Sequence, residues 1–222
     1  MGLKMPATRF GFKGLHQGET IWVIGSGSSL DHIDTRFFDD KICVAVNRVG
    51  MTYGLREFYT VSHYHRDVMM VTEERPDSPC IVPDDDLAGP PERANTRPDT
   101  DNIYFFPHTG QRFADFRPAD HWPEDPDTLV VGPTSLHMTM HFGAYLGAAS
   151  LVLVGADCGY LDDRSNFDGY AVGDNPFTVW QQTIGGVADQ LRARGVAVHS
   201  LNPFTNFALE GHTFRGPTTN IN

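Results

Sequence analysis

Residues 21–25 (IWVIG) form a continuous apolar run that ends in a glycine, and the glycine- and serine-rich segment 25–29 (GSGSS) follows at once. Unbroken apolar runs of this length are typical of strands that are covered on both faces, as in parallel sheets. Where such a strand turns into a helix, backbone N–H groups and the positive end of the helix face an incoming anion. The run therefore predicts a parallel α/β sheet.

The loop after this strand is the first candidate site. We predict that it binds the phosphates of a nucleotide through Gly25, Ser26, Gly27, Ser28 and Ser29. The pattern is an incomplete G-x-G-x-x-G, because Leu30 stands where the third glycine would be, and this weakens a dinucleotide assignment. The alternative is a tight strand-to-helix turn with a serine cap, which needs no ligand.

Further segments along the chain predict alternating strands and helices. The expected strands are residues 41–46, 57–61, 151–155 and 196–201, and the expected helices are residues 30–38, 134–148 and 175–194. This alternation indicates a Rossmann-like, doubly wound and mostly parallel sheet. The length of 222 residues suits one domain, so we expect residues 1–222 to form a single nucleotide-binding α/β domain.

The middle of the chain is rich in proline and acidic residues. Residues 76–133 hold eleven of the fifteen prolines, and a proline cannot donate a hydrogen bond to a sheet. We therefore predict an irregular insertion or lid at residues 84–133, in which residues 103–106 (IYFF) form the one plausible strand.

Net charge and cysteine content indicate which partners and which cell compartment to expect. The net charge of −11 gives no long-range help to an extended nucleic-acid surface, and none is predicted. Cys43, Cys80 and Cys158 have neither metal-ligand nor redox spacing and suggest reduced thiols. With no run near the ~20 apolar residues of a membrane-spanning helix, we expect a cytoplasmic protein with no integral membrane segment.

Polar side chains follow the predicted strands where each strand ends. The carboxyl ends of parallel strands meet at one edge of a sheet, where open α/β folds bind ligands, so we expect these side chains to share one site. Any one of them alone is more typical of a loop or cap residue. The candidate nucleotide contacts are Asn47, Arg48, Thr134, Ser135 and Tyr160, and the candidate catalytic residues are His63, His65 and Asp157.

Two other features leave alternatives open. His137 and His141 are spaced as metal ligands on a helix can be, but no third ligand is evident, so we predict two partly exposed or packed histidines and no metal site. The glycine-rich segment 166–174 either closes over a ligand or only connects two elements. Apolar residues near the C-terminus leave a homo-oligomer open.

Taken together, five motifs resemble the superfamily that contains bacterial sialyltransferase-like glycosyltransferases and 6-hydroxymethylpterin diphosphokinase-like proteins. Their order and spacing match over residues 20–207, whereas the insertion has no counterpart. The motifs are IGSGSSLDHID (24–34), VAVN (44–47), TSL (134–136), VGAD (154–157) and LNP (201–203).

The resemblance implies roles for several residues. In that superfamily a G-x-G-P-S-L loop meets the nucleotide phosphates, an asparagine after the second strand holds the nucleotide, and a G-x-D motif borders the site. Ser28 stands where the family usually has proline. The implied positions here are Gly25, Gly27, Ser28, Ser29, Asn47 and Asp157 and, by similarity to the sialyltransferase branch, Thr134, Ser135 and Tyr160 near the leaving phosphate.

The resemblance does not identify the general base in this chain. The sialyltransferase branch places a histidine beyond the G-x-D strand, and here no histidine lies between Asp157 and His199. His63 and His65 are candidates from their position alone.

Three functions remain as expectations. The first is a glycosyltransferase that moves a sugar from a nucleotide-sugar to an acceptor hydroxyl and requires no cofactor. The second is a diphosphokinase that acts on a pterin-like alcohol and needs Mg²⁺ with carboxylate ligands such as Asp157. The third is a nucleotide-binding module without catalysis.

Overall fold

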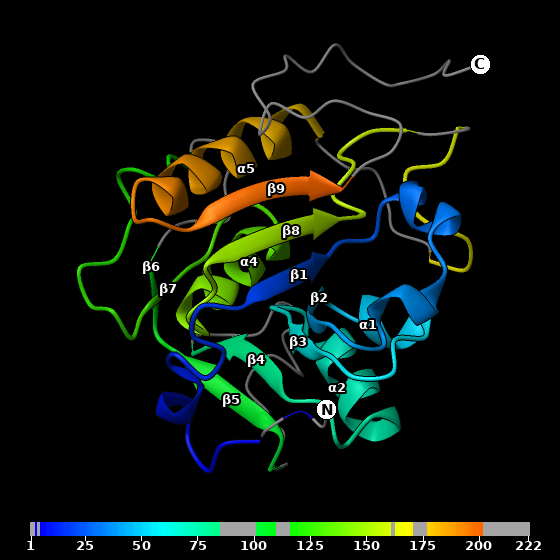
Figure 1. The fold of residues 1–222 in the computed structure, drawn as a ribbon, viewed down its shortest axis with the longest axis horizontal. Helices are drawn as coiled ribbons and strands as arrows, with labels where there is room; N and C mark the ends of the chain where they lie inside the picture. The colour runs from blue at the N-terminus through cyan, green and yellow to red at the C-terminus, as the bar shows by residue number, and fades with distance from the viewer. Residues whose placement is uncertain are drawn as a thin grey trace.

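The computed structural model describes residue 3 and residues 5–84, 101–109, 116–160, 163–170 and 177–201, and for His65 and residues 177–179 it describes the backbone alone. A parallel sheet with the strand order β5-β4-β3-β2-β1-β8-β9 forms the centre of the molecule (Figure 1). The strands are β1 (Thr20–Ile24), β2 (Ile42–Val46), β3 (Tyr59–Val61), β4 (Cys80–Pro83), β5 (Ile103–Phe106), β8 (Ser150–Val154) and β9 (Ala197–Leu201). The predicted Rossmann-like, doubly wound sheet is confirmed.

Helices cover both faces of this sheet. The helices are α1 (Val49–Tyr53), α2 (His65–Glu74), α4 (Ser135–Tyr145) and α5 (Phe177–Arg192), and the 3-10 helices are η1 (Arg9–Phe12), η2 (Ser28–His32) and η3 (Thr35–Phe38). Side chains of β1 alternate between two cores: Ile21 and Val23 pack with α4 and α5, whereas Ile24 packs with α1, α2 and the 3-10 helices η2 and η3. This double coverage explains the unbroken apolar run in the sequence.

The strand order reverses at β1. This strand pairs in parallel with β2 on one side and with β8 on the other, and β8 lies far along the chain. From β1 the chain builds the sheet outward to β5, and then returns through α4 to β8 and β9. The loops after β1 and β8 therefore leave two neighbouring strands at the carboxyl edge. This is the usual ligand position in open α/β sheets.

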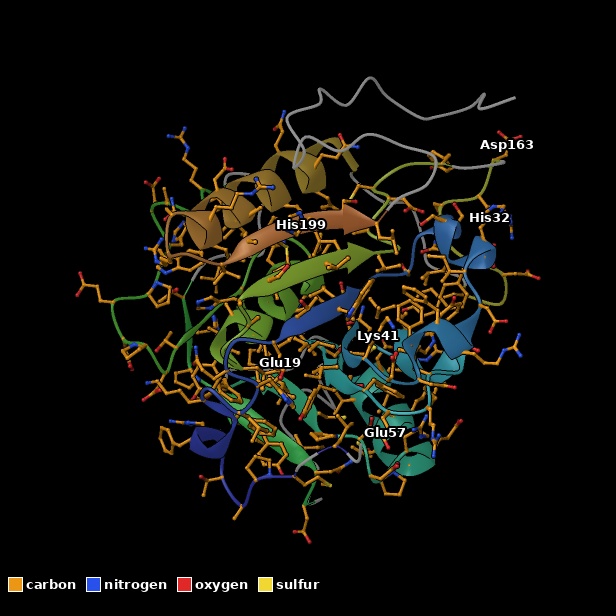
Figure 2. All side chains as sticks on the ribbon, viewed as in Figure 1. Glu19, His32, Lys41, Glu57, Asp163 and His199 are labelled. Carbon is orange, nitrogen blue, oxygen red and sulfur yellow. The ribbon has the colours of Figure 1, made fainter. Side chains whose placement is uncertain are left out.

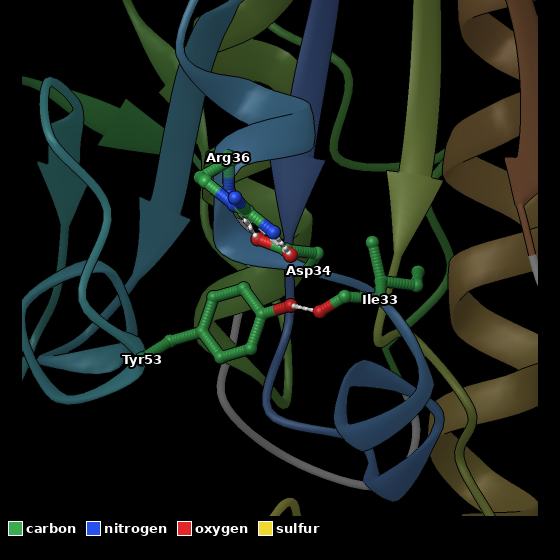
Figure 3. Close-up of polar contacts among 4 residues, drawn as sticks. All are labelled: Ile33, Asp34, Arg36 and Tyr53. Atoms are coloured by element: carbon green, nitrogen blue, oxygen red, sulfur yellow. Dashed lines mark hydrogen bonds and ion pairs between the residues drawn. The ribbon is translucent and has the colours of Figure 1, made fainter.

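The predicted helix over residues 30–38 is wrong, because two separate 3-10 helices, η2 and η3, cover that region. Asp34 lies between them and accepts a hydrogen bond from the Arg36 N–H, which starts η3 (Figure 3). The hydroxyl of Tyr53 donates to the carbonyl oxygens of Ile33 and Leu30. These side chains satisfy backbone groups that a continuous helix would have paired internally.

The proline-rich middle of the chain is more regular than expected. The predicted strand at residues 103–106 is confirmed as β5, but β4, which directly precedes residues 84–133, was not predicted. Its Pro83 is the last residue of the strand, where the missing N–H is tolerated. Two short strands, β6 (His108–Thr109) and β7 (Leu129–Val130), pair with each other in a small second sheet, whereas residues 85–100 and 110–115 lie outside the described residues.

The two later helices occur where the sequence predicts them. The region 134–148 contains α4, and the region 175–194 contains α5. Asn175 and Pro176, at the start of the predicted region, lie outside the described residues, whereas Gly195, just after its end, has φ +85° and ends the helical region. Among the described residues, no helix has the length and apolar character needed to cross a membrane.

His137 and His141 on α4 are packed against neighbouring elements. The Nδ1 atom of His137 accepts from the Thr134 N–H at 3.2 Å, and its Nε2 atom lies 2.8 Å from the Thr183 hydroxyl of α5. The Nδ1 atom of His141 accepts from the Val130 N–H at 3.0 Å. These contacts hold α4 against α5 and β7, so the packed alternative is the one that the structure supports.

A pH dependence of stability follows from His137. Burial lowers the pKa of its ring from 6.5 to about 4 in the folded state, so the unfolded chain takes up the proton first as the pH falls. The stability from the neutral ring is fully present above pH 6.5 and is lost as the pH falls toward 4. In urea titrations, His137 should lower the free energy of unfolding by up to about 1.4 kcal/mol per pH unit in this window.

His137→Asn is the control for this prediction. It keeps a side-chain oxygen that can accept from the Thr134 N–H but removes the titrating ring. The variant should be less stable than the wild type at pH 7 and should show a shallower loss of stability between pH 6.5 and 4. The same slope in both proteins would show that His137 does not cause it.

Candidate functional site

The candidate site lies where several loops meet at the carboxyl edge of the sheet. The loop after β1 holds residues 25–29, the loop after β8 holds residues 155–160, and Asn47 follows β2 directly. His63 follows β3, and Ser135 is the first residue of α4. Hydrogen bonds between these segments show which of them contact one another, and they form two neighbouring groups.

The first group joins the loop after β1 to Asp157. The Ser29 N–H donates to Asp157 Oδ2 at 2.7 Å, and the Ser29 hydroxyl donates to Oδ1 at 2.6 Å. The Gly27 N–H donates to the Gly155 carbonyl at 2.6 Å. A Cβ atom on Gly27 would lie 2.8 Å from that carbonyl oxygen and would also meet the Asp157 carboxylate, so the close contact between the loops requires glycine.

Asp157 is therefore engaged within the protein. Its side chain is buried, and both carboxylate oxygens accept from Ser29. Burial raises the pKa of this carboxyl group, while the hydrogen bonds from Ser29 and the charge of His32 oppose the rise. In this arrangement Asp157 connects two loops, and its catalytic role stays a prediction.

Segment 163–170 lies against the glycine- and serine-rich loop. The Ser26 hydroxyl donates to Asn166 Oδ1 at 2.8 Å, and the Ser28 hydroxyl donates to the Arg164 carbonyl at 2.9 Å. The Phe167 N–H donates to the Ser26 carbonyl at 3.0 Å. The hydroxyls of Ser26, Ser28 and Ser29 thus all have partners in the protein, and this part of the predicted closing segment contacts the loop.

The second group is a buried cluster at the ends of β2 and β3. The Ser62 and Ser135 hydroxyls both donate to Asn47 Oδ1, each at 2.9 Å. The Ser135 oxygen also lies 3.3 Å from His63 Nδ1. Ser62, His63 and Ser135 are buried, and Asn47 is half-buried. The structure therefore brings together three predicted site residues, Asn47, His63 and Ser135.

Arg48 lies beside this cluster in a buried ion pair. Its Nη1 atom is 2.8 Å from Asp67 Oδ1, and the two side chains are only 19% and 9% exposed. The guanidinium lies over the ring of Tyr170, 4.8 Å from the ring centre. Burial and the charge of Asp67 raise the pKa of Tyr170, while Arg48 and a hydrogen bond from Asn47 oppose the rise. Asp67 thus balances the charge that Arg48 was predicted to offer a phosphate.

The remaining predicted residues have more ordinary positions. Thr134 is the N-cap of α4 and accepts from the Leu136 N–H at 3.1 Å. Tyr160 is half-buried in the loop after β8, and only the backbone of His65 is described, as the first residue of α2. His199 lies in the middle of β9 on an exposed position, away from the strand end (Figure 2).

Sequence reasoning missed the roles of Asp67 and Tyr170. Asp67 lies in the first turn of α2, a helix that was not predicted. An acidic residue at such a position is a signal for a helix start, but the preceding segment gave no cap residue. Tyr170 reaches Arg48 and Asn47 from a segment more than a hundred residues later, which no local pattern indicates.

Within the described ranges, no group of three or more histidine, cysteine, aspartate and glutamate side chains is arranged to hold a metal ion. No family model, curated protein or solved structure matches the chain.

The Ser29–Asp157 contact predicts an effect on stability. Ser29→Ala removes one of two donors to a buried carboxylate, so we expect the free energy of unfolding to fall by about 1–3 kcal/mol in urea titration. Ser28→Ala, whose hydroxyl bonds one carbonyl, is the matched control and should cost less. In an Asp157→Asn background, Ser29→Ala should cost less than in the wild type, whereas additive losses would refute the coupling.

Proposed function

We propose that the protein is a glycosyltransferase that binds a nucleotide-sugar at this edge of the sheet and transfers the sugar to an acceptor hydroxyl. The observation that carries the proposal is the cluster of Asn47, Ser62, His63 and Ser135 beside the glycine- and serine-rich loop. It combines a histidine, a side-chain amide and the positive end of an α-helix at the position where open α/β sheets bind ligands.

The hydrogen bonds of the cluster suit His63 to act as a base. Because the Ser135 hydroxyl donates to Asn47, its oxygen is left to accept a hydrogen bond from one ring nitrogen of His63, of which Nδ1 lies at 3.3 Å and Nε2 at 3.5 Å. The other ring nitrogen of a neutral histidine then carries a lone pair. A neutral imidazole in a fixed orientation is the form that a general base requires.

In the proposed reaction, the acceptor oxygen bonds to the anomeric carbon of the sugar and loses its proton to His63. The bond between that carbon and the phosphate oxygen breaks, and the nucleotide leaves with both electrons of the bond. Among the described residues, the N–H groups of Ser26 and Ser28 have no acceptor, so they can donate to the departing phosphate. The positive end of α4 supports the same charge.

The carboxylates near the site favour sugar transfer over a magnesium-dependent kinase. Both oxygens of Asp157 accept from Ser29, and Asp67 is paired with Arg48. A magnesium ion would have to compete with these contacts for the carboxylate oxygens through which it binds. Glycosyl transfer with a histidine base requires no such competition.

The first test is thermal-shift screening with CMP, UDP, GDP and ATP, each with and without Mg²⁺. We expect stabilisation by CMP or a nucleoside diphosphate without metal, since binding to the folded state alone raises the melting temperature. Stabilisation that requires both ATP and Mg²⁺ would support the diphosphokinase instead. No stabilisation by any of the four would contradict the proposal.

The second test separates catalysis from binding. Proton removal by a placed side chain contributes about 10²–10⁴ in rate, so His63→Ala should lower turnover by that factor and change the affinity for the nucleotide much less. His199→Ala removes an exposed histidine away from the strand end and is the matched control. Equal turnover in the two variants would exclude His63 as the base. Nucleotide binding without turnover in the wild type would favour the non-catalytic module.

A further inference from the structure

Asn47 is held in place by its backbone as well as by its side chain. Its φ of +53° lies in the left-handed region, which asparagine tolerates better than most other residues. Its N–H donates to the Val61 carbonyl at 2.8 Å, so the residue continues the pairing of β2 with β3. The side chain therefore starts from a fixed point at the edge of the sheet.

Ser62 determines which atom of the Asn47 amide faces inward. The Ser62 oxygen accepts from the Tyr64 N–H at 3.0 Å, and its own proton is donated to Asn47 Oδ1 at 2.9 Å. Ser62 is fully buried. A half-turn of the amide would place the Asn47 NH₂ group against this hydroxyl and would leave the buried hydroxyl proton without its acceptor.

The second hydroxyl at this oxygen reinforces the same orientation. Ser135 donates to Asn47 Oδ1 at 2.9 Å, so the two lone pairs of the carbonyl oxygen are both occupied. The NH₂ group is therefore on the other side of the amide, toward Tyr170, and hydrogen bonding from Asn47 opposes the rise in the pKa of Tyr170. Tyr170 belongs to the segment that lies against the glycine- and serine-rich loop, so the amide is directed toward the candidate site.

We infer that Ser62 is a positioning residue that makes Asn47 a hydrogen-bond donor toward the ligand, and that the ligand group at Asn47 is an acceptor such as a phosphate or sugar oxygen. This inference rests on the proposed nucleotide site. It excludes an amine or another obligate donor at that position, because such a group would meet an N–H donor of the Asn47 amide and find no acceptor there.

The orientation is tested first in the protein without ligand. In ¹⁵N-edited NMR spectra, the side-chain NH₂ signal of Asn47 is identified by its absence in Asn47→Asp. We expect its protons to show nuclear Overhauser effects to the Tyr170 ring. Effects to the Ser62 and Ser135 side chains in place of Tyr170 would overturn the inference, and this result does not depend on whether any nucleotide binds.

The role in binding is tested by a double-mutant cycle. Asn47→Asp keeps the inward oxygen for Ser62 and Ser135, tolerates the left-handed backbone and replaces the outward donor by an acceptor. It should fold with a melting temperature near that of the wild type and bind CMP, UDP, GDP or ATP at least about tenfold more weakly, for whichever of these the wild type binds. Unchanged affinity would overturn the donor assignment.

Ser62→Ala separates positioning from general stability. It should weaken nucleotide binding by about five- to tenfold in the wild-type background and have little further effect in Asn47→Asp, where no donor remains to be oriented. Ser78→Ala is the matched control, because Ser78 is also buried and donates to a backbone carbonyl next to β3. Equal weakening by Ser62→Ala in both backgrounds would overturn the positioning role. If no nucleotide binds the wild type, the proposed function fails, and the NMR measurement still decides the orientation.

Discussion

The pairing of β1 with strands on both of its sides determines where every other part of the candidate site lies. β1 forms parallel ladders with β2 and with β8, so its backbone pairs on both sides, and Ile21, Val23 and Ile24 are buried in the two cores. Parallel pairing places the ends of all three strands at one edge. The loops after β1 and β8 and the residue after β2 then meet there, although they are separated by up to about 130 residues.

The loop after β1 is shaped by the protein's own side chains. Ser29 is held by Asp157, Ser26 and Ser28 are held by segment 163–170, and Gly27 packs directly on Gly155. Such contacts fix the loop before a ligand arrives, which reduces the conformational entropy lost on binding. The same contacts limit what the proposed ligand could use: a phosphate would meet backbone N–H groups, because the serine hydroxyls already bond within the protein.

The parts of the fold that the sequence predicts well are those with a strong local pattern. Hydrophobic periodicity and apolar composition were enough to predict β1, β8 and α5. β4 was missed because the strand has only four residues and ends in Pro83. The helix over residues 30–38 was wrong because the side chains of Asp34, within that segment, and Tyr53, outside it, satisfy backbone groups that a helix would pair internally.

In the candidate site, too, local sequence patterns predict some positions but not the contacts between distant residues. The ends of predicted strands were enough to place Asn47 and His63 on one edge, because parallel topology fixes that arrangement. The partners of these residues were not predictable. Ser135 reaches Asn47 across 88 residues, and Asp157 reaches Ser29 across 128. Only the packed fold brings such pairs together, since nothing in the neighbouring sequence specifies them.

The charges around the site bear on how an acidic protein would bind the proposed anionic ligand there. The chain has a net charge of −11, and two arginines near this edge are paired, Arg48 with Asp67 and Arg164 with Asp31. Net positive charge therefore does not supply the attraction. Backbone N–H groups, the positive end of α4 and the amide of Asn47 are fixed dipoles, and fixed dipoles stabilise an anion at short range without reorganising. Because dipole fields fall off faster with distance than those of charges, the position of each donor matters more here than the overall charge. This is the physical reason that a buried serine able to orient one amide can influence binding.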